Sequence, residues 1–182
     1  MKTEILYGFH PVYEALAAGR RRIFEIYLVQ EKQSGRLGSI VSLAESRGIA
    51  LHAIGSANLK TLVGPVVHQG VAARVSPYPL SPLTAILQEA QAGNNKFFLL
   101  MLDNVVDPQN LGAILRTALC VGCAAVLLPK DRSVRPTPIV SKTSAGALEH
   151  TRLVQVTNLA NALDMFKKRG FWVAGTDVAA GE

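Results

Sequence analysis

The sequence predicts an α/β protein, with a small α/β domain at the N-terminus followed by a domain built on a parallel sheet. Three observations support this prediction. Segments typical of helices and of strands alternate along the chain, as they do in layered α/β folds. Of the 182 residues, 49% are hydrophobic, which is enough to form a core in one domain or in two small ones. The proline-rich stretch SPYPLSP at 76–82 divides the alternating pattern in two.

Residues 1–75 form the first predicted domain. The run IFEIYLV at 23–29 is rich in residues that favour strands, and Gly19 and Gly48 stand where helices commonly end. The predicted elements are, in order, a helix over 10–19, a strand over 23–29, a helix over 37–44, a strand over 51–54, a short helix and a strand over 70–75.

Residues 76–95 form a predicted connector. Its three prolines favour extended backbone and remove hydrogen-bond donors, so we expect a flexible linker. Ser81 followed by Pro82 fits the start of a helix that runs to about residue 92. Gly93 and the two asparagines after it would end that helix.

Residues 96–182 form the second predicted domain. The continuous apolar run FFLLML at 97–102 is typical of a strand buried on both faces of a parallel sheet. Because such sheets bind ligands at the carboxyl ends of their strands, the residues that follow each strand are candidates for a binding site. Further strands are expected over 124–128, 153–156 and 171–174, and helices over 108–121, 137–148 and 158–169.

The chain carries a formal net charge of +6 and has a pI near 9.6, which favours a polyanionic partner. Residues 1–75 hold nine Lys and Arg against five acids, and residues 96–182 hold ten against seven. Both domains could therefore contact such a partner.

No apolar run approaches the roughly 18 residues needed to span a bilayer, and the first residues lack the apolar core of a signal peptide, so we expect no membrane association. Two cysteines cannot form a disulfide framework, which favours a reducing, cytoplasmic setting. Cys120 and Cys123 have the C-x-x-C spacing of a redox motif or of half a zinc site. There is no second pair, and we predict no metal site.

The stretch DNVVDPQNLGAILRTA at 103–118 is the most informative in the chain. Asp107 can cap a helix and Pro108 can occupy its first turn, directly after the first strand of the second domain. At about 100° per residue, Asn110 and Arg116 flank the apolar stripe of this helix on opposite sides. The pattern alone leaves two interpretations open, a capped helix with a solvated arginine or part of a functional site.

This stretch resembles the first signature motif of the SpoU (TrmH-like) family of RNA ribose 2′-O-methyltransferases. Three others are similar to the two-domain, rRNA-modifying branch of that family: YGFHPVYEAL at 7–16, HQGVAARV at 68–75 and SKTSAGALEH at 141–150. The resemblance implies a small ribosomal-protein-like α/β domain for RNA binding. It also implies a SPOUT-type methyltransferase domain with a parallel sheet, a C-terminal trefoil knot and a homodimer.

The reaction implied by the resemblance is transfer of a methyl group from S-adenosylmethionine to a ribose 2′-hydroxyl. The family motif places Arg116 at that hydroxyl and gives Asn110 a role in orienting the site. A guanidinium, with a pKa above about 12, is poorly suited to act as a base. We therefore expect Arg116 to position phosphate and hydroxyl and to stabilise the developing oxyanion.

The expected substrate is RNA, most simply a guanosine of large-subunit rRNA. The alternatives are tRNA as the substrate, and a non-catalytic RNA-binding protein with a degenerate methyltransferase half. Cations that follow the first helix, or the second strand of the second domain, are expected to contact phosphates. They are Arg20, Arg21, Arg22, Lys130, Arg132, Arg135 and Lys142.

Two later motifs of the family, which build most of the adenosylmethionine pocket and the knot, have no counterpart in these 182 residues. The sequence therefore predicts a methyltransferase domain truncated before the trefoil knot, and it identifies no cofactor-binding residues. We expect these residues to show no measurable adenosylmethionine binding in isothermal titration.

Overall fold

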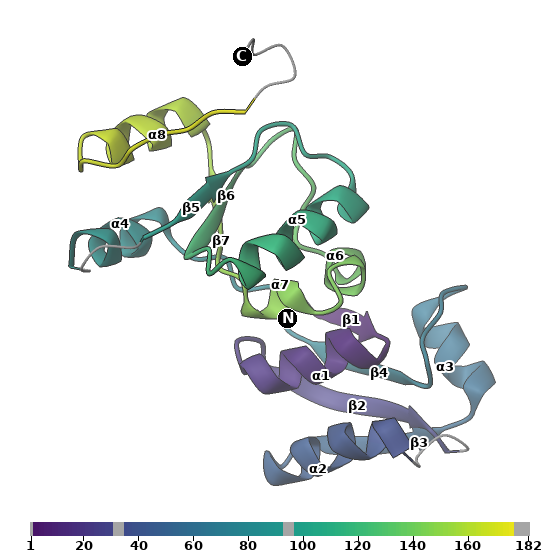
Figure 1. The fold of residues 1–182 in the computed structure, drawn as a ribbon. Coiled ribbons are helices and arrows are strands. Elements are labelled where there is room, and N and C mark those ends of the chain that lie inside the picture. The colour runs from purple at the N-terminus through teal and green to yellow at the C-terminus, as the bar shows by residue number, and fades with distance from the viewer. Residues whose placement is uncertain (1, 31–34, 93–96, 177–182) are drawn as a thin grey trace.

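The computed structural model describes residues 2–30, 35–92 and 97–176. Figure 1 shows two α/β units, one around a sheet near the N-terminus and one around a second sheet formed by later residues. The second sheet is parallel, which confirms the predicted fold class.

The N-terminal sheet has the strand order β1-β4-β2-β3. β2 and β3 are parallel, and β4 runs antiparallel to both β1 and β2. The strands are β1 (Glu4–Tyr7), β2 (Ile23–Val29), β3 (Ala50–Ile54) and β4 (Val71–Val75). The sequence does not predict β1, because four residues are too few to show a clear alternation of polar and apolar side chains.

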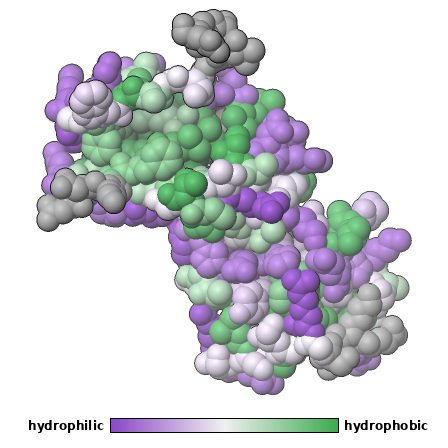
Figure 2. Space-filling model, viewed as in Figure 1, coloured by the Kyte–Doolittle hydropathy of each residue, from purple (hydrophilic) through white to green (hydrophobic). Residues whose placement is uncertain are grey.

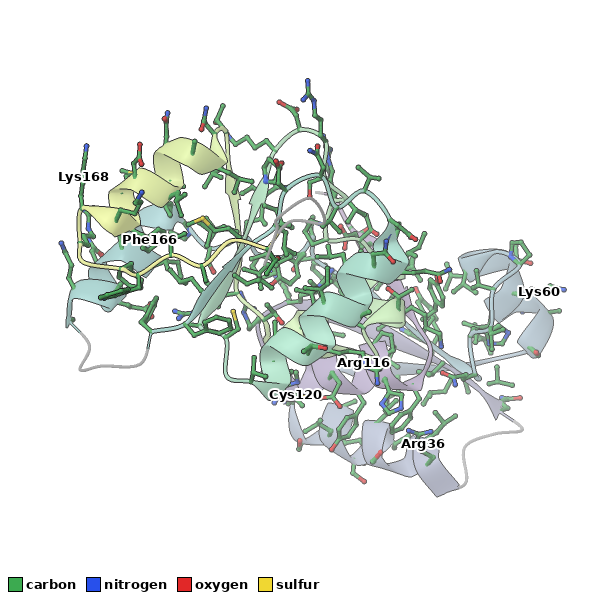
Figure 3. The ribbon with its side chains drawn as sticks, turned by 45° about the horizontal axis from the view of Figure 1, so that its top comes forward. Arg36, Lys60, Arg116, Cys120, Phe166 and Lys168 are labelled. Carbon is green, nitrogen blue, oxygen red and sulfur yellow. The ribbon has the colours of Figure 1, made fainter. Side chains whose placement is uncertain are left out.

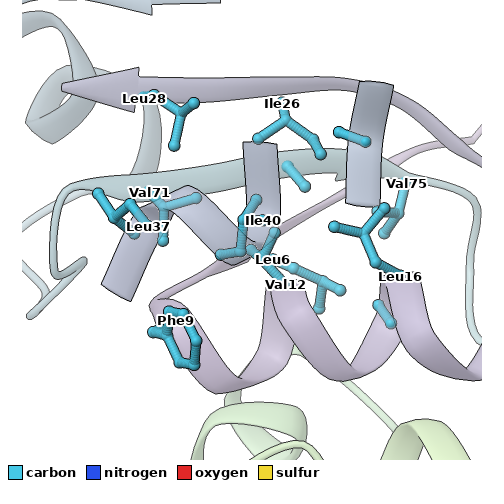
Figure 4. Packing of buried hydrophobic residues seen from close by; sticks show 13 residues of the cluster. Leu6, Phe9, Val12, Leu16, Ile26, Leu28, Leu37, Ile40, Val71 and Val75 are labelled. Carbon is cyan, nitrogen blue, oxygen red and sulfur yellow. The ribbon is translucent and has the colours of Figure 1, made fainter. Parts of the chain in front are cut away.

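Three helices cover this sheet: α1 and α2 pack on one face, and α3 packs on part of the other. They are α1 (Phe9–Ala18), α2 (Gly38–Ser46) and α3 (Ser56–Val63). α1 ends at Gly19, whose φ of 63° lies in the left-handed region that glycine adopts without strain. Figure 4 shows the core beneath α1 and α2, where Leu6, Leu16, Ile26 and Ile40 are fully buried. Each such side chain stabilises the unit by about 1.5–3 kcal/mol.

The connector is packed against the protein. The Tyr78 side chain is only 7% exposed, and the Ser81 amide donates a hydrogen bond to the Leu153 carbonyl at 2.8 Å. These contacts contradict the expectation of a flexible linker. The predicted helix is present as α4 (Leu83–Ala92), and the residues predicted to end it, 93–95, lie outside the described residues.

The second sheet has three parallel strands in the order β5-β6-β7. The strands are β5 (Leu99–Met101), β6 (Ala125–Pro129) and β7 (Leu153–Val156). The helices are α5 (Pro108–Cys120), α6 (Pro138–Thr143), α7 (Ala147–His150) and α8 (Leu159–Lys167). The buried residues of α5, α6 and α7 form a core on one face, and those of α4 and α8 form a core on the other. Figure 2 shows hydrophobic residues gathered over the sheet between α4 and α8.

The helix predicted over 137–148 is divided into α6 and α7. Ala145 and Gly146, between them, have φ values of 51° and 85°, which no α-helix contains. The chain therefore turns sharply at a point where the apolar pattern runs on without a break.

The prediction of a strand over 171–174 is wrong, because residues 171–176 form no β-ladder with any strand that the structure describes. Phe171 packs its ring edge-on against Phe166 at 5.2 Å, whereas Trp172 is 99% exposed. The contacts of Phe171 with Phe166 and Phe97 anchor this segment, and its alternating side chains reflect no pairing with the described strands.

Candidate active site

The helix that carries the family motif, α5, begins as its sequence predicts. The Asp107 carboxylate accepts a hydrogen bond from the Gln109 amide at 2.8 Å, and Pro108 occupies the first turn. Leu111 and Leu115 are fully buried against the sheet. This packing fixes which sides of α5 face the solvent.

Arg116 lies on the exposed side of α5 that faces the N-terminal unit (Figure 3). It lines a groove of about 400 Å³. The other lining residues come from α5, from α7 and the turn before it, and from α1: Leu119, Cys120, Ser144, Ala145, Ala147, His150 and Glu14. Within the described part of the chain, no hydrogen bond or ion pair engages the Arg116 guanidinium. All its donors can therefore be used on an anionic ligand.

Asn110 lines a different groove, of about 420 Å³, together with the loop at 104–107 and two residues of α5, Ala113 and Ile114. Six residues along a helix turn by about 240° beyond one full turn, so Asn110 and Arg116 point in directions about 120° apart. The structure does not bring these two predicted site residues into one groove.

The groove beside Arg116 is built by both units. His150 of α7 and Glu14 of α1 form an ion pair with 2.8 Å between Nε2 and Oε2. Gly146 makes this approach possible, since a Cβ at that position would overlap the Glu14 side chain and lie 3.0 Å from the His10 carbonyl oxygen. Glu14 and His150 were not predicted as site residues, although both lie in stretches that carry the family resemblance.

Arg21 links the two units in the protein interior. Its side chain is fully buried, with Nε 2.8 Å from a Glu149 oxygen and Nη1 2.6 Å from a Glu4 oxygen. The other Glu149 oxygen accepts a hydrogen bond from the Ser141 hydroxyl at 2.8 Å. Burial raises the pKa of Glu149, and the Arg21 charge and the Ser141 hydrogen bond oppose that rise. This burial contradicts the prediction that Arg21 contacts RNA.

The two neighbours of Arg21 differ in exposure. The Arg20 guanidinium donates to the Tyr78 hydroxyl at 3.2 Å and to the Thr151 carbonyl, so it holds the connector against the second unit. Arg22 is exposed, and its guanidinium lies 5.1 Å from the centre of the Phe24 ring. Of the three predicted RNA contacts in this run, the structure leaves Arg22 most accessible.

Lys142 lies between the units. Its Nζ donates to the Gln69 side-chain oxygen at 2.9 Å, and the same oxygen accepts the Phe9 amide at 3.0 Å. Burial lowers the pKa of Lys142. Gly8 leaves room for this contact, because a Cβ there would overlap Lys142 Nζ and displace the lysine side chain. The lysine therefore joins the YGFHP and HQG stretches to α6.

Lys130, Arg132 and Arg135 are exposed in the loop that follows β6, and the described residues offer none of them an ion pair. Lys130 also lines a groove of about 330 Å³ at the carboxyl ends of β6 and β7. Its other polar lining residues include Thr157 and Asn158, and the Asn158 side chain caps α8. This edge is where parallel sheets usually bind ligands.

The two cysteines differ in environment. Cys120 is exposed in the Arg116 groove, whereas burial raises the pKa of the Cys123 thiol, which donates to the Ala125 carbonyl at 3.2 Å. Across residues 2–30, 35–92 and 97–176, neither a cluster able to hold a metal ion nor a helix able to cross a membrane is found.

Residues 5–81 match the family described as RNA 2′-O ribose methyltransferase substrate binding, and residues 97–182 match the SpoU rRNA Methylase family. The chain is 37% identical over 179 residues to the 23S rRNA (guanosine-2′-O-)-methyltransferase RlmB of Coxiella burnetii, a match covering 98% of this chain and 71% of the relative. It is 39% identical over 173 residues to the enzyme of that name from Acinetobacter baylyi, covering 93% and 68%.

The fold is similar to the crystal structure of the SpoU methyltransferase AviRb from Streptomyces viridochromogenes in complex with AdoMet. The TM-score is 0.68 at 16% identity, and the match covers 91% of this chain and 60% of that one. The chain thus spans about 70% of its curated relatives and less than two thirds of this solved chain. Both units match, and the chain belongs to the SpoU rRNA methylase family.

Proposed function

We propose that this chain takes part in the methylation of a ribose 2′-hydroxyl in RNA, with S-adenosylmethionine as the methyl donor and a guanosine of large-subunit rRNA as the preferred substrate. The observation that carries the proposal is the exposed Arg116 guanidinium, which has no partner in the described residues and lines a groove built by both units. The names of the relatives support the choice of rRNA.

Arg116 holds the RNA at the reacting ribose. Its planar fork of donors binds a phosphate oxygen and the 2′-oxygen together, which orients the hydroxyl for attack. The hydroxyl proton would pass to water as the new carbon–oxygen bond forms and the carbon–sulfur bond of the donor breaks to leave a neutral thioether, and the Arg116 charge stabilises the oxygen while it is anionic. The guanidinium does not take the proton itself, because its pKa is above about 12.

S-adenosylmethionine supplies an electrophilic methyl group on a sulfonium sulfur. The described residues that fit part of this molecule lie at the carboxyl ends of β6 and β7. Thr157 and Asn161 could hydrogen-bond its polar groups, and Leu83 and Met165 could pack against its adenine ring. Asn110, in its separate groove, is proposed to orient the turn at 104–107, which begins the helix that carries Arg116.

The phosphate contacts are proposed for the exposed cations Arg22, Lys130, Arg132 and Arg135. We propose a division into an RNA-binding domain at 1–75, a connector at 76–95 and part of the methyltransferase domain at 96–182. A homodimer and a cytoplasmic location are proposed as well, the latter supported by the two free cysteines.

The test is methyl transfer to purified rRNA and tRNA, followed by mass spectrometry of their nucleosides. We expect a 2′-O-methylguanosine product from rRNA when these residues are joined to the two later family motifs that build most of the adenosylmethionine pocket, and no product without them. Arg116→Lys keeps the charge but loses the fork, so methyl transfer should fall at least about tenfold while Arg169→Lys, on an exposed arginine beyond α8, leaves it unchanged. RNA binding without methylation of either RNA, in the protein that carries the two later motifs as well, would favour the non-catalytic alternative.

A further inference from the structure

The N-terminal sheet has one face that is only partly covered. α1 and α2 pack on the opposite face. On this face Leu59 of α3 forms a small cluster with Val29 and Ala72, and Tyr7 and Tyr27 pack against the cluster as partly buried side chains. The strand register places Tyr7 beside Ala72, Ala72 beside Tyr27, and Tyr27 beside His52. Three ring side chains therefore lie in one row across all four strands.

The rings in this row are partly accessible, whereas Ala72, between Tyr7 and Tyr27, is fully buried. Tyr7 and Tyr27 are half-buried at the edge of α3, and His52 is exposed. The Tyr27 and His52 rings lie 5.7 Å apart between centroids, and the small side chain of Ala72 separates Tyr27 from Tyr7. Flat rings spaced along an open sheet form a surface on which other rings can stack.

The charges next to this row favour an anionic partner. Glu25 is engaged by its neighbours, with the Arg74 Nε at 2.7 Å and the His52 Nε2 at 3.1 Å. The Tyr27 hydroxyl also donates to it, and this hydrogen bond is the main reason that the pKa of Glu25 is lowered. The carboxylate on this face is thus neutralised by its own partners.

A phenyl ring lies between two guanidinium groups at the end of the face. The Arg22 and Arg74 guanidinium carbons are 5.1 and 5.7 Å from the centre of the Phe24 ring. Both arginines are exposed, and stacking on the ring holds their donors in place. This arrangement places two guanidinium groups beside the row of rings: the Arg74 Nε is paired with Glu25, and the Arg22 group has no ion pair within the described residues.

We propose that these side chains form a binding face for single-stranded RNA, the ring face, with bases stacked on the rings of Tyr7, Tyr27 and His52 and phosphates bound by Arg22 and Arg74. The inference rests on the proposed function and assigns it a docking site away from Arg116. Unpaired bases are required, because the faces of paired bases are hidden within a duplex. β1 ends at Tyr7, and Gly8 directly after it lies beside Lys142 of α6, so an RNA strand that leaves the ring face over β1 arrives at the methyltransferase domain.

The test compares binding of a fluorescein-labelled single-stranded RNA of about 12 nucleotides with binding of a duplex of the same length, by fluorescence anisotropy. Tyr27→Val removes a ring but keeps a residue that favours strands, and we expect it to weaken single-strand binding by about 5- to 100-fold. Tyr27→Phe keeps the ring and should bind within about twofold of the unchanged protein. Tyr13→Leu, which removes a ring packed on the α1 side, is the matched control.

A second arm tests the cations. Arg22→Ala should reduce the slope of log affinity against log salt by about one, whereas Lys168→Ala, beyond α8 and far from the ring face in Figure 3, should not. Each variant is first checked for an unchanged urea unfolding midpoint, and if Tyr27→Val unfolds, His52→Ala on the edge strand takes its place.

Three results would overturn the ring face: equal affinity of Tyr27→Val and the unchanged protein, equal loss in Tyr27→Phe and Tyr27→Val, or preference for the duplex. In each case RNA still binds, so the proposed function survives. Absence of binding to either RNA contradicts both proposals, and loss of methyl transfer with intact ring-face binding contradicts only the proposed function.

Discussion

The buried pair of Arg21 and Glu149 predicts a large and pH-dependent loss of stability when one partner is removed. The two side chains are 0% and 1% exposed, and the Arg21 Nε lies 2.8 Å from the carboxylate. Arg21→Met keeps an apolar chain of similar length but leaves the Glu149 charge buried without its cation. We expect the free energy of unfolding to fall by about 3–5 kcal/mol near neutral pH.

The size of this loss should depend on pH in a defined direction. Burial already raises the pKa of Glu149 above the ordinary glutamate value of 4.5, and loss of the Arg21 charge raises it further. The folded protein then holds this proton more strongly than the unfolded chain, so stability falls as the pH rises above about 4.5. The deficit of Arg21→Met should therefore be smaller at about pH 5 than near pH 7, as long as both forms remain folded.

A double variant isolates the charge as the cause. Arg21→Met combined with Glu149→Leu removes both charges, and we expect its stability to lie within about 2 kcal/mol of the unchanged protein, with the unpaired Ser141 hydroxyl accounting for part of the difference. Arg169→Met, on an exposed arginine, should change stability by less than about 0.5 kcal/mol. Urea unfolding followed by circular dichroism measures these four proteins and the single variant Glu149→Leu. A loss below about 1 kcal/mol in Arg21→Met, or a double variant that loses the sum of both single losses, would refute this reasoning.

Three further predictions concern the junction and the candidate site. Gly146→Ala should destabilise the protein by at least about 1 kcal/mol in thermal unfolding, because its φ of 85° disfavours a side chain and a Cβ would overlap Glu14; an unchanged midpoint would mean that the units separate freely. Asp107→Ala should lower the free energy of unfolding by about 1 kcal/mol through loss of the cap on α5, whereas Asp107→Asn should keep most of the stabilisation that the cap provides. Arg132→Ala should weaken RNA binding evenly across sequences and reduce its salt slope by about one, and an unchanged slope would remove Arg132 from the phosphate contacts.

Much of the fold could be predicted because its signals are local. The Asp107 cap, the Pro108 start and the buried Leu111 and Leu115 stripe of α5 are all encoded within a dozen residues, and the structure contains each of them. The prediction of a strand over 171–174 was wrong because it, too, relied on a local signal. Its alternating pattern is local, but a strand also requires a neighbour that supplies hydrogen bonds, and the pattern does not contain that information.

The candidate site was predictable only in part. The motif that carries the family resemblance singled out Arg116, and the structure adds that its groove is completed by Glu14 from the other unit. The arginine run at 20–22 illustrates the limit of sequence patterns. Three adjacent arginines have similar chemistry, yet Arg21 is buried between carboxylates and Arg22 is exposed on Phe24.

The sequence by itself determined the α/β class, the caps and apolar stripes of the helices, and the family to which the chain belongs. These depend on residues close together in the chain or on the motif as a string. The tertiary structure decided which charges are available. Arg21 and Glu149 are 128 positions apart, and their burial depends on the docking of α1 against α7 across Gly146. The surroundings of a charged side chain decide whether it can contact RNA or forms a structural ion pair. Burial removes the water that would otherwise solvate the charge, so a buried charge needs a partner within the protein.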